Sequence, residues 1–105
     1  MPAIVQNLLV AATVPTDGNA VTTYRDNEAT GLVVIVKGAG TLTAYTMLIQ
    51  GRMSSSDSWY TVATITEATW DAQKSNAQLV RMWPEMRASL TSKTGTASIT
   101  ARLME

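Results

Sequence analysis

The chain has 105 residues, eight basic and eight acidic side chains that sum to a formal net charge of zero, and neither cysteine nor histidine. Its length allows one domain with one core, and its scattered charges exclude the basic patch expected of a nucleic-acid-binding protein. The apolar runs are too short to span a membrane as helices, and the start lacks the charged segment of a signal peptide. No membrane or nucleic-acid partner is therefore expected.

The predicted elements are β-strands, because Thr, Val and Ile recur along the chain and are interrupted every few residues by Gly, Pro, Asn and Asp. The first strand region covers residues 3–14, so residues 1–19 form either an N-terminal arm or a first strand. A turn follows at 15–19. Residues 21–25 then predict a short edge strand.

A central strand is predicted for the uninterrupted apolar run 32–36, which follows Gly31. One face of this strand would meet the core, and the other would need a cover from a loop or a neighbouring subunit. Gly38 and Gly40 predict a hairpin, because glycine adopts the positive φ of a tight reversal. The return strand is predicted over 41–52, and both of its faces mix apolar with polar residues, so neither is expected to be freely solvated.

The C-terminal half predicts further strands over residues 59–65, 78–82, 85–92 and 96–103, with a serine-rich loop at 53–58 and a long loop at 66–77. Alternation in the last two strands places these apolar side chains on the core face: Met86, Ala88, Leu90, Ala97, Ile99, Ala101 and Leu103. The total is seven or eight strands. The chain is therefore predicted to be all-β, a single antiparallel β-sandwich domain over residues 1–105, of jelly-roll or immunoglobulin-like type.

Residues suited to catalysis are scarce. The absence of histidine and cysteine removes the commonest general base, the thiol nucleophile and the usual zinc ligands. Asp57, Glu67 and Asp71 come nearest to a cluster of carboxylates. All three lie in or beside predicted loops, where carboxylates are usually solvated, and they match no calcium-loop motif. We therefore predict no catalytic residue, no metal, no cofactor and no enzymatic activity.

Aromatic and methionine side chains are the candidates for contact with a partner. Trp59 opens a strand and Trp83 precedes Pro84 at a strand junction, so both tryptophans are predicted to be buried. Trp70 lies in the long loop and is the candidate for an exposed anchor. The predicted partner-binding residues are Trp70, Tyr45, Met47, Met53 and Met82.

Several stretches share more than a general β pattern, namely residues 31–38, 41–44, 48–52, 56–63, 83–90 and 94–101. In this order, a strand that ends in Gln50-Gly51 leads into a Ser/Asp loop and a strand opened by Trp59, and a Thr-Gly hairpin at 94–95 precedes the last strand. The arrangement, which extends over residues 31–103, resembles a group of small β-sandwich virion proteins of tailed bacteriophages.

The resemblance implies a non-enzymatic structural protein, in the first place a capsid decoration (cement) protein that binds the outer surface of a phage head and stabilises capsomer junctions. It implies synthesis in the host bacterial cytoplasm, a location on the virion, and the major capsid protein or another virion protein as partner. The expected state is a homo-oligomer, a dimer or a trimer. A neck or fibre component stays open as an alternative, and so does a carbohydrate-binding module that stacks sugars on Trp70, Tyr60 or Trp59.

Overall fold

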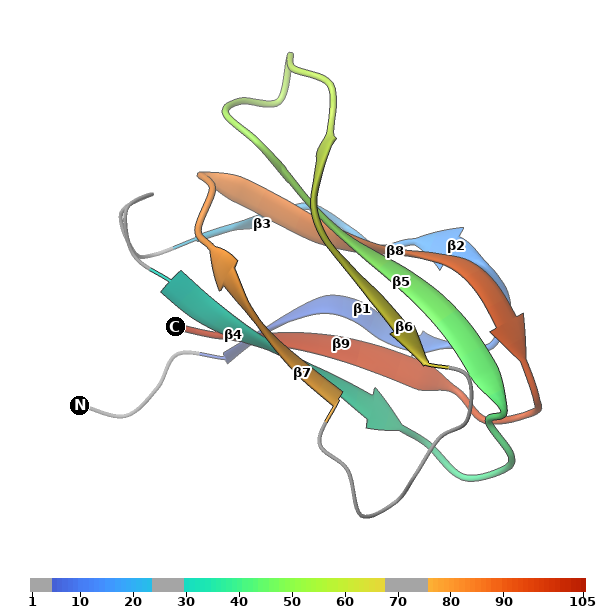
Figure 1. Ribbon diagram of the computed structural model, residues 1–105. Coiled ribbons are helices and arrows are strands. Elements are labelled where there is room, and N and C mark those ends of the chain that lie inside the picture. The colour runs from blue at the N-terminus through green and yellow to red at the C-terminus, as the bar shows by residue number, and fades with distance from the viewer. Residues whose placement is uncertain (1–4, 24–29, 68–75) are drawn as a thin grey trace.

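The computed structural model describes residues 5–23, 30–67 and 76–105, in which two antiparallel sheets pack face to face (Figure 1). The sheet called here the β4 sheet has the order β1 (Val5–Ala12), β9 (Ile99–Met104), β4 (Thr30–Lys37) and β7 (Asn76–Arg81). The β5 sheet has the order β2 (Thr16–Asp17), β8 (Glu85–Thr94), β5 (Ala44–Arg52) and β6 (Tyr60–Glu67), and β3 (Val21–Thr22) also pairs with β8. The predicted all-β antiparallel sandwich is confirmed, with nine strands among the described residues in place of the predicted seven or eight.

The strands pair in a nested order. β1 pairs with β9, β2 and β3 pair with β8, β4 pairs with β7, and β5 pairs with β6. Successive pairs lie in alternate sheets, which is the connectivity of a jelly roll. In an immunoglobulin-like sandwich the last strand lies beside the strand before it, whereas β9 lies between β1 and β4. Of the two predicted types, the chain therefore adopts the jelly roll.

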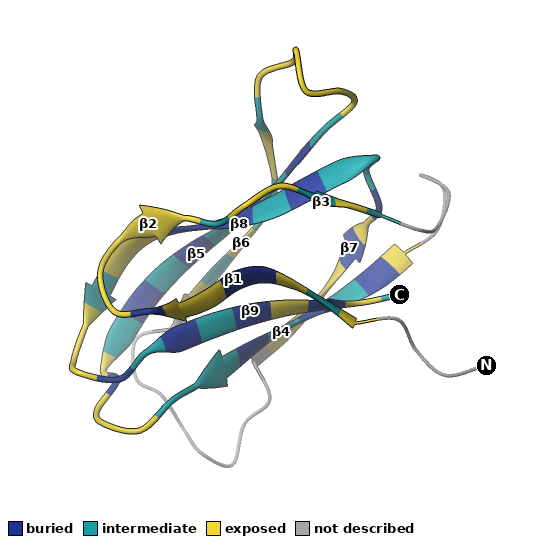
Figure 2. Cartoon of the chain, turned by 180° about the vertical axis from the view of Figure 1, so that it is seen from behind, coloured by how far each residue is buried: buried dark blue, intermediate teal, exposed yellow. Residues whose placement is uncertain are grey.

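The core lies between the sheets and is built by alternation along the long strands. In β4, β5 and β9 every second residue is buried, which Figure 2 shows as alternating dark bands. The buried apolar side chains of these strands and of β8 are Val33, Ile35, Tyr45, Met47, Ile49, Met86, Ala88, Leu90, Ile99, Ala101 and Leu103. The predicted core faces of residues 85–92 and 96–103 are therefore confirmed.

The predicted hairpin at 38–40 is wrong, because β4 and β5 lie in different sheets. Gly40 has a φ of 113°, so the chain does reverse there. The connection pairs instead with the segment between β8 and β9: Gly38 N–H donates to Ser98 O at 2.8 Å, and Ala97 N–H donates to Thr41 O at 2.8 Å. A glycine permits the reversal, but packing of the whole chain decides which strand becomes the neighbour.

The N-terminal segment is a strand with irregular pairing. β1 ends at Ala12, before the predicted limit of the region 3–14. Its register with β9 shifts twice, and Ala11 has a positive φ of 47°. The predicted edge strand at 21–25 appears as the two-residue β3. Predictions that fall on residues 1–4, 24–29 and 68–75, including Trp70 and Asp71, lie outside the described residues.

Candidate interaction surface

The outer face of the β5 sheet carries charged side chains that partner one another. Arg52 Nη2 lies 2.9 Å from Glu85 Oε1 on the neighbouring strand. Arg87 Nε donates a hydrogen bond to Gln50 Oε1 at 2.8 Å, and Arg87 Nη1 lies 3.6 Å from Asp17 Oδ2. These contacts join β2, β8 and β5 across the face. These polar groups therefore bind one another within the chain, and their contacts stabilise the sheet.

Trp59 covers part of this network. The guanidinium carbons of Arg52 and Arg87 lie 4.1 Å and 4.6 Å from the centre of its ring, within the range of a cation–π interaction. The prediction that Trp59 packs in the core is wrong, because β6 bulges at Val62: Ala63 pairs with Ile49, but Thr61 already pairs with Gln50. One extra residue in a strand moves every preceding side chain to the opposite side of the sheet. Trp59 therefore faces outward.

The same bulge places Tyr60 opposite Gly51 at one end of the sandwich. The Tyr60 ring stacks on Trp83, with ring centres 5.9 Å apart and planes inclined by 27°. Trp83 is half-buried against the core and against Gly51, where a Cβ would meet the Trp83 ring at about 2.5 Å. Tyr60 remains 61% exposed. The pair forms a small aromatic surface beside the loop between β5 and β6.

The outer face of the β4 sheet is apolar, in contrast to that of the β5 sheet. Val5 pairs with Met104, Met104 with Leu32, and Leu32 with Leu79, so that the residues lie in one row across all four strands. Their side chains face away from the core, because the buried residues of β4 and β9 occupy the alternate positions. Val5 is 53% exposed, Met104 37% and Leu79 66%, and Leu32 is half-buried. We call these four residues the apolar row.

The residues next to the apolar row on this face extend the apolar surface and add positive charge. Val34 pairs with Ala77 on one side and with Arg102 on the other. Arg81 follows Leu79 at the next outward position of β7 and pairs with Thr30. Among the described residues, the charged side chains that the register places on this face are these two arginines, and both are exposed. The apolar row is therefore flanked by Arg81 on the edge strand β7 and by Arg102 on the inner strand β9, where Arg102 also pairs with Asn7.

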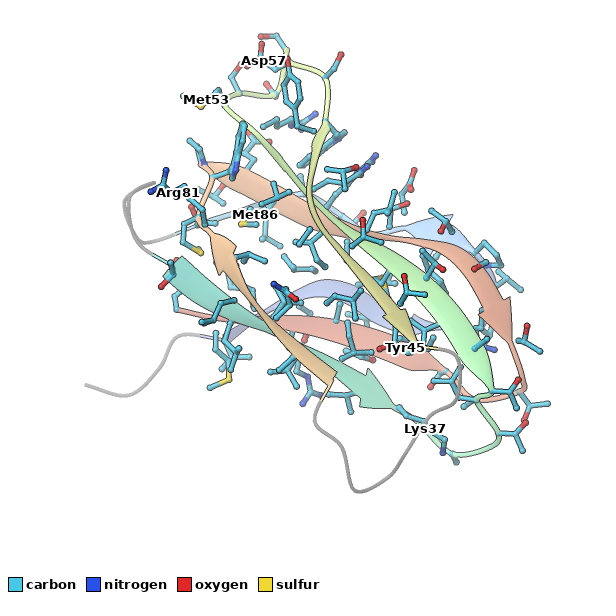
Figure 3. The ribbon with its side chains drawn as sticks, viewed as in Figure 1. Lys37, Tyr45, Met53, Asp57, Arg81 and Met86 are labelled. Carbon is cyan, nitrogen blue, oxygen red and sulfur yellow. The ribbon has the colours of Figure 1, made fainter. Side chains whose placement is uncertain are left out.

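The predicted partner-binding residues lie in different environments. Tyr45, Met47 and Met82 are buried in the core, so their assignment as partner contacts is wrong. Both faces of β5 carry apolar residues, so alternation does not distinguish the face that turns inward. In the structure, the face that carries Tyr45 and Met47 lies against the opposite sheet. Met53 is exposed on the loop between β5 and β6, which projects beyond both sheets (Figure 3), and it stays a prediction. Trp70 lies outside the described residues.

Asp57 organises the projecting loop. Its Oδ2 accepts hydrogen bonds from the backbone N–H and the hydroxyl of Ser54, both at 3.1 Å, and Asp57 N–H donates to Ser54 O at 3.0 Å. This is the local bonding by which Asp favours turns. Within residues 5–23, 30–67 and 76–105, no group of three or more acidic side chains lies close enough to hold a metal ion. Asp57 thus has a structural role in the loop.

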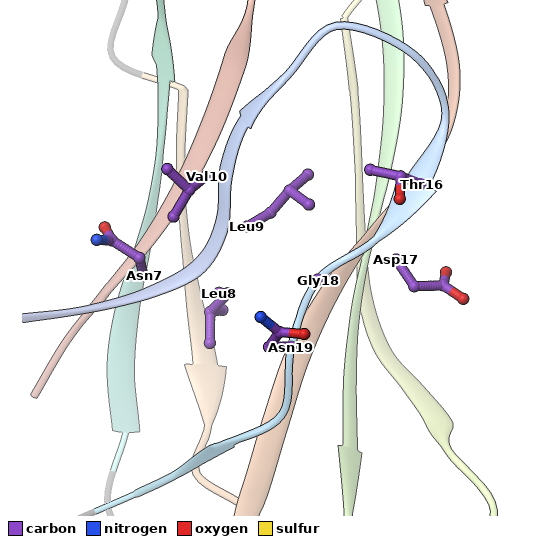
Figure 4. Close-up of a pocket in the computed structure, with 8 residues that line it drawn as sticks. All are labelled: Asn7, Leu8, Leu9, Val10, Thr16, Asp17, Gly18 and Asn19. Carbon is purple, nitrogen blue, oxygen red and sulfur yellow. The ribbon is translucent and has the colours of Figure 1, made fainter.

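A hollow of about 220 Å³ lies at the seam between the two sheets, where β1 passes the segment that contains β2 (Figure 4). Its lining residues are Asn7, Leu8, Leu9, Val10, Thr16, Asp17, Gly18 and Asn19. Gly18 allows the close approach: its N–H donates to Ala88 O at 2.7 Å, and a Cβ there would overlap the carbonyl of Leu8. The hollow is therefore a packing feature of the seam.

Sequence reasoning missed the apolar row because its members come from four separate strands. Only Leu32 belongs to the uninterrupted apolar run 32–36, and the register that aligns it with the other three residues follows from the strand pairing. The helices needed to cross a membrane are not found among the described residues. Comparison with protein-family models, with curated proteins and with solved structures finds no match to this chain. The resemblance to phage virion proteins therefore stays a prediction.

Proposed function

We propose that this chain is a non-enzymatic structural protein of a tailed-phage virion, which docks on the outside of the head through the outer face of the β4 sheet and stabilises capsomer junctions. The observation that carries the proposal is the apolar row, whose four side chains lie in register across one face of the sheet. The resemblance over residues 31–103 and the use of jelly rolls in viral coat proteins support the proposal by analogy.

The apolar row sets the scale of the attraction. Complete burial of one such side chain contributes about 1.5–3 kcal/mol, so a row that is about half-exposed contributes on the order of 3–6 kcal/mol. Association costs about 4–15 kcal/mol in lost freedom of motion. A single face therefore binds weakly, and a protein that uses it gains affinity from many copies on one lattice. Decoration of a capsid is a function of that kind.

The arginines beside the apolar row indicate the chemistry of the partner. Arg81 and Arg102 are exposed beside the row, and an apolar partner surface that carries carboxylates would pair with them. Such rim charges mainly accelerate association and make it sensitive to salt. We expect the partner surface on the capsid to carry apolar side chains opposite the row and carboxylates opposite the two arginines.

The experiment that tests the proposal begins with mass spectrometry and electron microscopy of the purified phage particle. The protein is expected on the head surface, and its absence from the particle would sink the proposal. A position at the neck or on a fibre would replace decoration with the alternative role. Binding to heads that lack the protein then tests the face by co-sedimentation.

Two variants probe the face directly. Val5→Lys and Met104→Lys each place a charge in the apolar row, and each is expected to weaken binding to heads at least about tenfold. Thr64→Lys is the matched control, because Thr64 is exposed on the outer side of the β5 sheet. If all three variants bind as the unaltered protein does, the docking face is assigned wrongly.

Carbohydrate binding is the second candidate, and the aromatic surface of Tyr60 and Trp83 favours it. Tyr60 is exposed, and its ring is held by the stack on Trp83, as a sugar-stacking platform would be. Trp59 is less suitable because its ring lies against two guanidinium groups. A glycan array tests this function: specific binding that Tyr60→Ala abolishes would establish it.

A further inference from the structure

The two sheets have four edges, and within the described residues the strands at three of these edges are short or irregular. β1 shifts register twice against β9, and its Ala11 has a positive φ. β2 and β3 are two residues long each, and β6 bulges at Val62. Short strands, bulges and bends are the devices by which proteins prevent pairing at a sheet edge. Three of the edges are therefore protected against another strand.

β7 is the uninterrupted edge. It pairs with β4 over six consecutive residues without a shift, from Asn76 opposite Ile35 to Arg81 opposite Thr30. It contains no proline, and no described strand pairs on its other side. β7 lies at the near side in Figure 1. A regular edge of this length presents backbone N–H and C=O groups to a further strand.

We propose that two copies of the chain pair through β7, antiparallel about a two-fold axis at Leu79, so that two β4 sheets join into one continuous eight-stranded sheet. In this register Leu79 lies opposite Leu79, and Ala77 lies opposite Arg81 of the second copy. Residues directly opposite in an antiparallel pair share one face. The register thus brings two exposed leucines together and sets no like charges opposite each other.

Other registers are less favourable on the same physical grounds. A slip by one residue would put the apolar faces of the two copies on opposite sides of the joined sheet. A two-fold axis at Arg81 would put Arg81 opposite Arg81, and like charges directly opposite are destabilising. The chain's zero net charge and low fraction of charged residues, 15%, oppose association little. A second copy fits this edge because the register at Leu79 sets leucine opposite leucine and opposes no like charges.

The pairing would double the apolar row. Val5, Met104, Leu32 and Leu79 of one copy would continue into the same residues of the other, across eight strands and about 33 Å at the usual strand spacing. This pairing does not depend on the proposed function, but it deepens it, because a dimer presents two docking faces on one side. The second face then binds at a high effective concentration.

The solution mass, measured by sedimentation and by light scattering over a concentration series, tests the pairing. The unaltered protein is expected to dimerise, and a monomer at every concentration up to about 1 mM would overturn the proposal. Leu79→Lys is expected to raise the dimer dissociation constant at least about tenfold. Val5→Lys is the matched control, since Val5 lies in the same row but on the opposite edge.

The control also separates two kinds of dimer. If Val5→Lys dissociates the dimer as strongly as Leu79→Lys, then the faces stack on one another and pairing through β7 is wrong. If Val5→Lys keeps the dimer but loses binding to phage heads, the edge and the face act separately. A dimer that never binds a head would overturn the proposed function and leave the pairing intact.

A third variant tests the register. Ala77→Glu places a carboxylate opposite Arg81 of the second copy, twice in each dimer. The dimer dissociation constant is expected to fall about threefold or more at low salt, and the gain is expected to vanish at high salt. Ala77→Lys should weaken the dimer by a similar factor. A dimer that responds to neither substitution would overturn the register at Leu79.

Discussion

At the scale of single residues, methionine occupies two opposite environments in this chain. Met47 is completely buried between the sheets, whereas Met53 is 58% exposed on the projecting loop (Figure 3). The sequence predicts both as partner contacts, because an unbranched apolar side chain suits a core and an adaptable surface equally. The difference follows from which face of β5 meets the opposite sheet.

Truncation of the two methionines should show this difference. Met47→Ala is expected to lower the free energy of unfolding by about 2–5 kcal/mol, through lost burial and a cavity. Met53→Ala is expected to change it by less than about 0.5 kcal/mol. Urea unfolding followed by circular dichroism measures both. Equal effects of the two substitutions would contradict the assignment of Met47 to the core.

At the scale of elements, two connections depend on glycine at positive φ. Gly40 follows β4 and Gly95 follows β8, with φ values of 113° and 121°. The two turns lie together: Thr41 N–H donates to Thr96 Oγ1 at 3.1 Å, and Ala97 N–H donates to Thr41 O. The reversal of β4 into the opposite sheet and the reversal of β8 into β9 therefore stabilise one another at one end of the sandwich.

Substitution of Gly40 tests the contact between these two turns. Gly40→Ala is expected to lower the free energy of unfolding by about 1–3 kcal/mol, because φ is positive there and the new Cβ would lie about 3.0 Å from the backbone nitrogen of Ala97. Ala39→Gly, at the exposed neighbouring position, is the control and should cost well under 1 kcal/mol. The prediction fails if Gly40→Ala leaves the urea midpoint unchanged.

At the scale of the whole molecule, the nested pairing joins segments that are far apart in the sequence. Val5, near the start of the chain, pairs with Met104, near its end. Among the described strands, only β5 and β6 pair across a short loop. The two outer faces also differ, one charged and internally paired and the other apolar. The molecule is therefore a sandwich with one charged outer face and one largely apolar outer face.

Folding kinetics should reflect this topology. Sheets that are dominated by distant pairings fold in milliseconds to seconds, because loop-closure entropy is lost before the pairings form. Refolding from urea, followed by stopped-flow tryptophan fluorescence, is therefore expected in that range, roughly 1–1000 s⁻¹ or slower. Complete refolding within the first 0.1 ms or so would show that local structure, rather than the pairing of β1 with β9, limits the rate.

The fold could be predicted to the level of class because periodicity is local. The alternation of Met86, Ala88 and Leu90, and of Ile99, Ala101 and Leu103, identified strands and their core faces correctly. The alternation predicted over residues 59–65 failed at Val62, since a bulge leaves no reliable mark in the sequence. Of the predicted contact residues, Met53 alone is described and exposed.

The all-β class, the short strands and the absence of histidine and cysteine chemistry can be read from the sequence, because residue type and alternation act within a few positions of each other. The partner of each strand depends on the tertiary structure. In that structure the chain passes at Gly40 into the opposite sheet, and Trp59 faces two arginines. The strand pairing aligns Val5, Met104, Leu32 and Leu79 in one row. Pairing and register depend on packing between distant segments, and no local pattern contains that information.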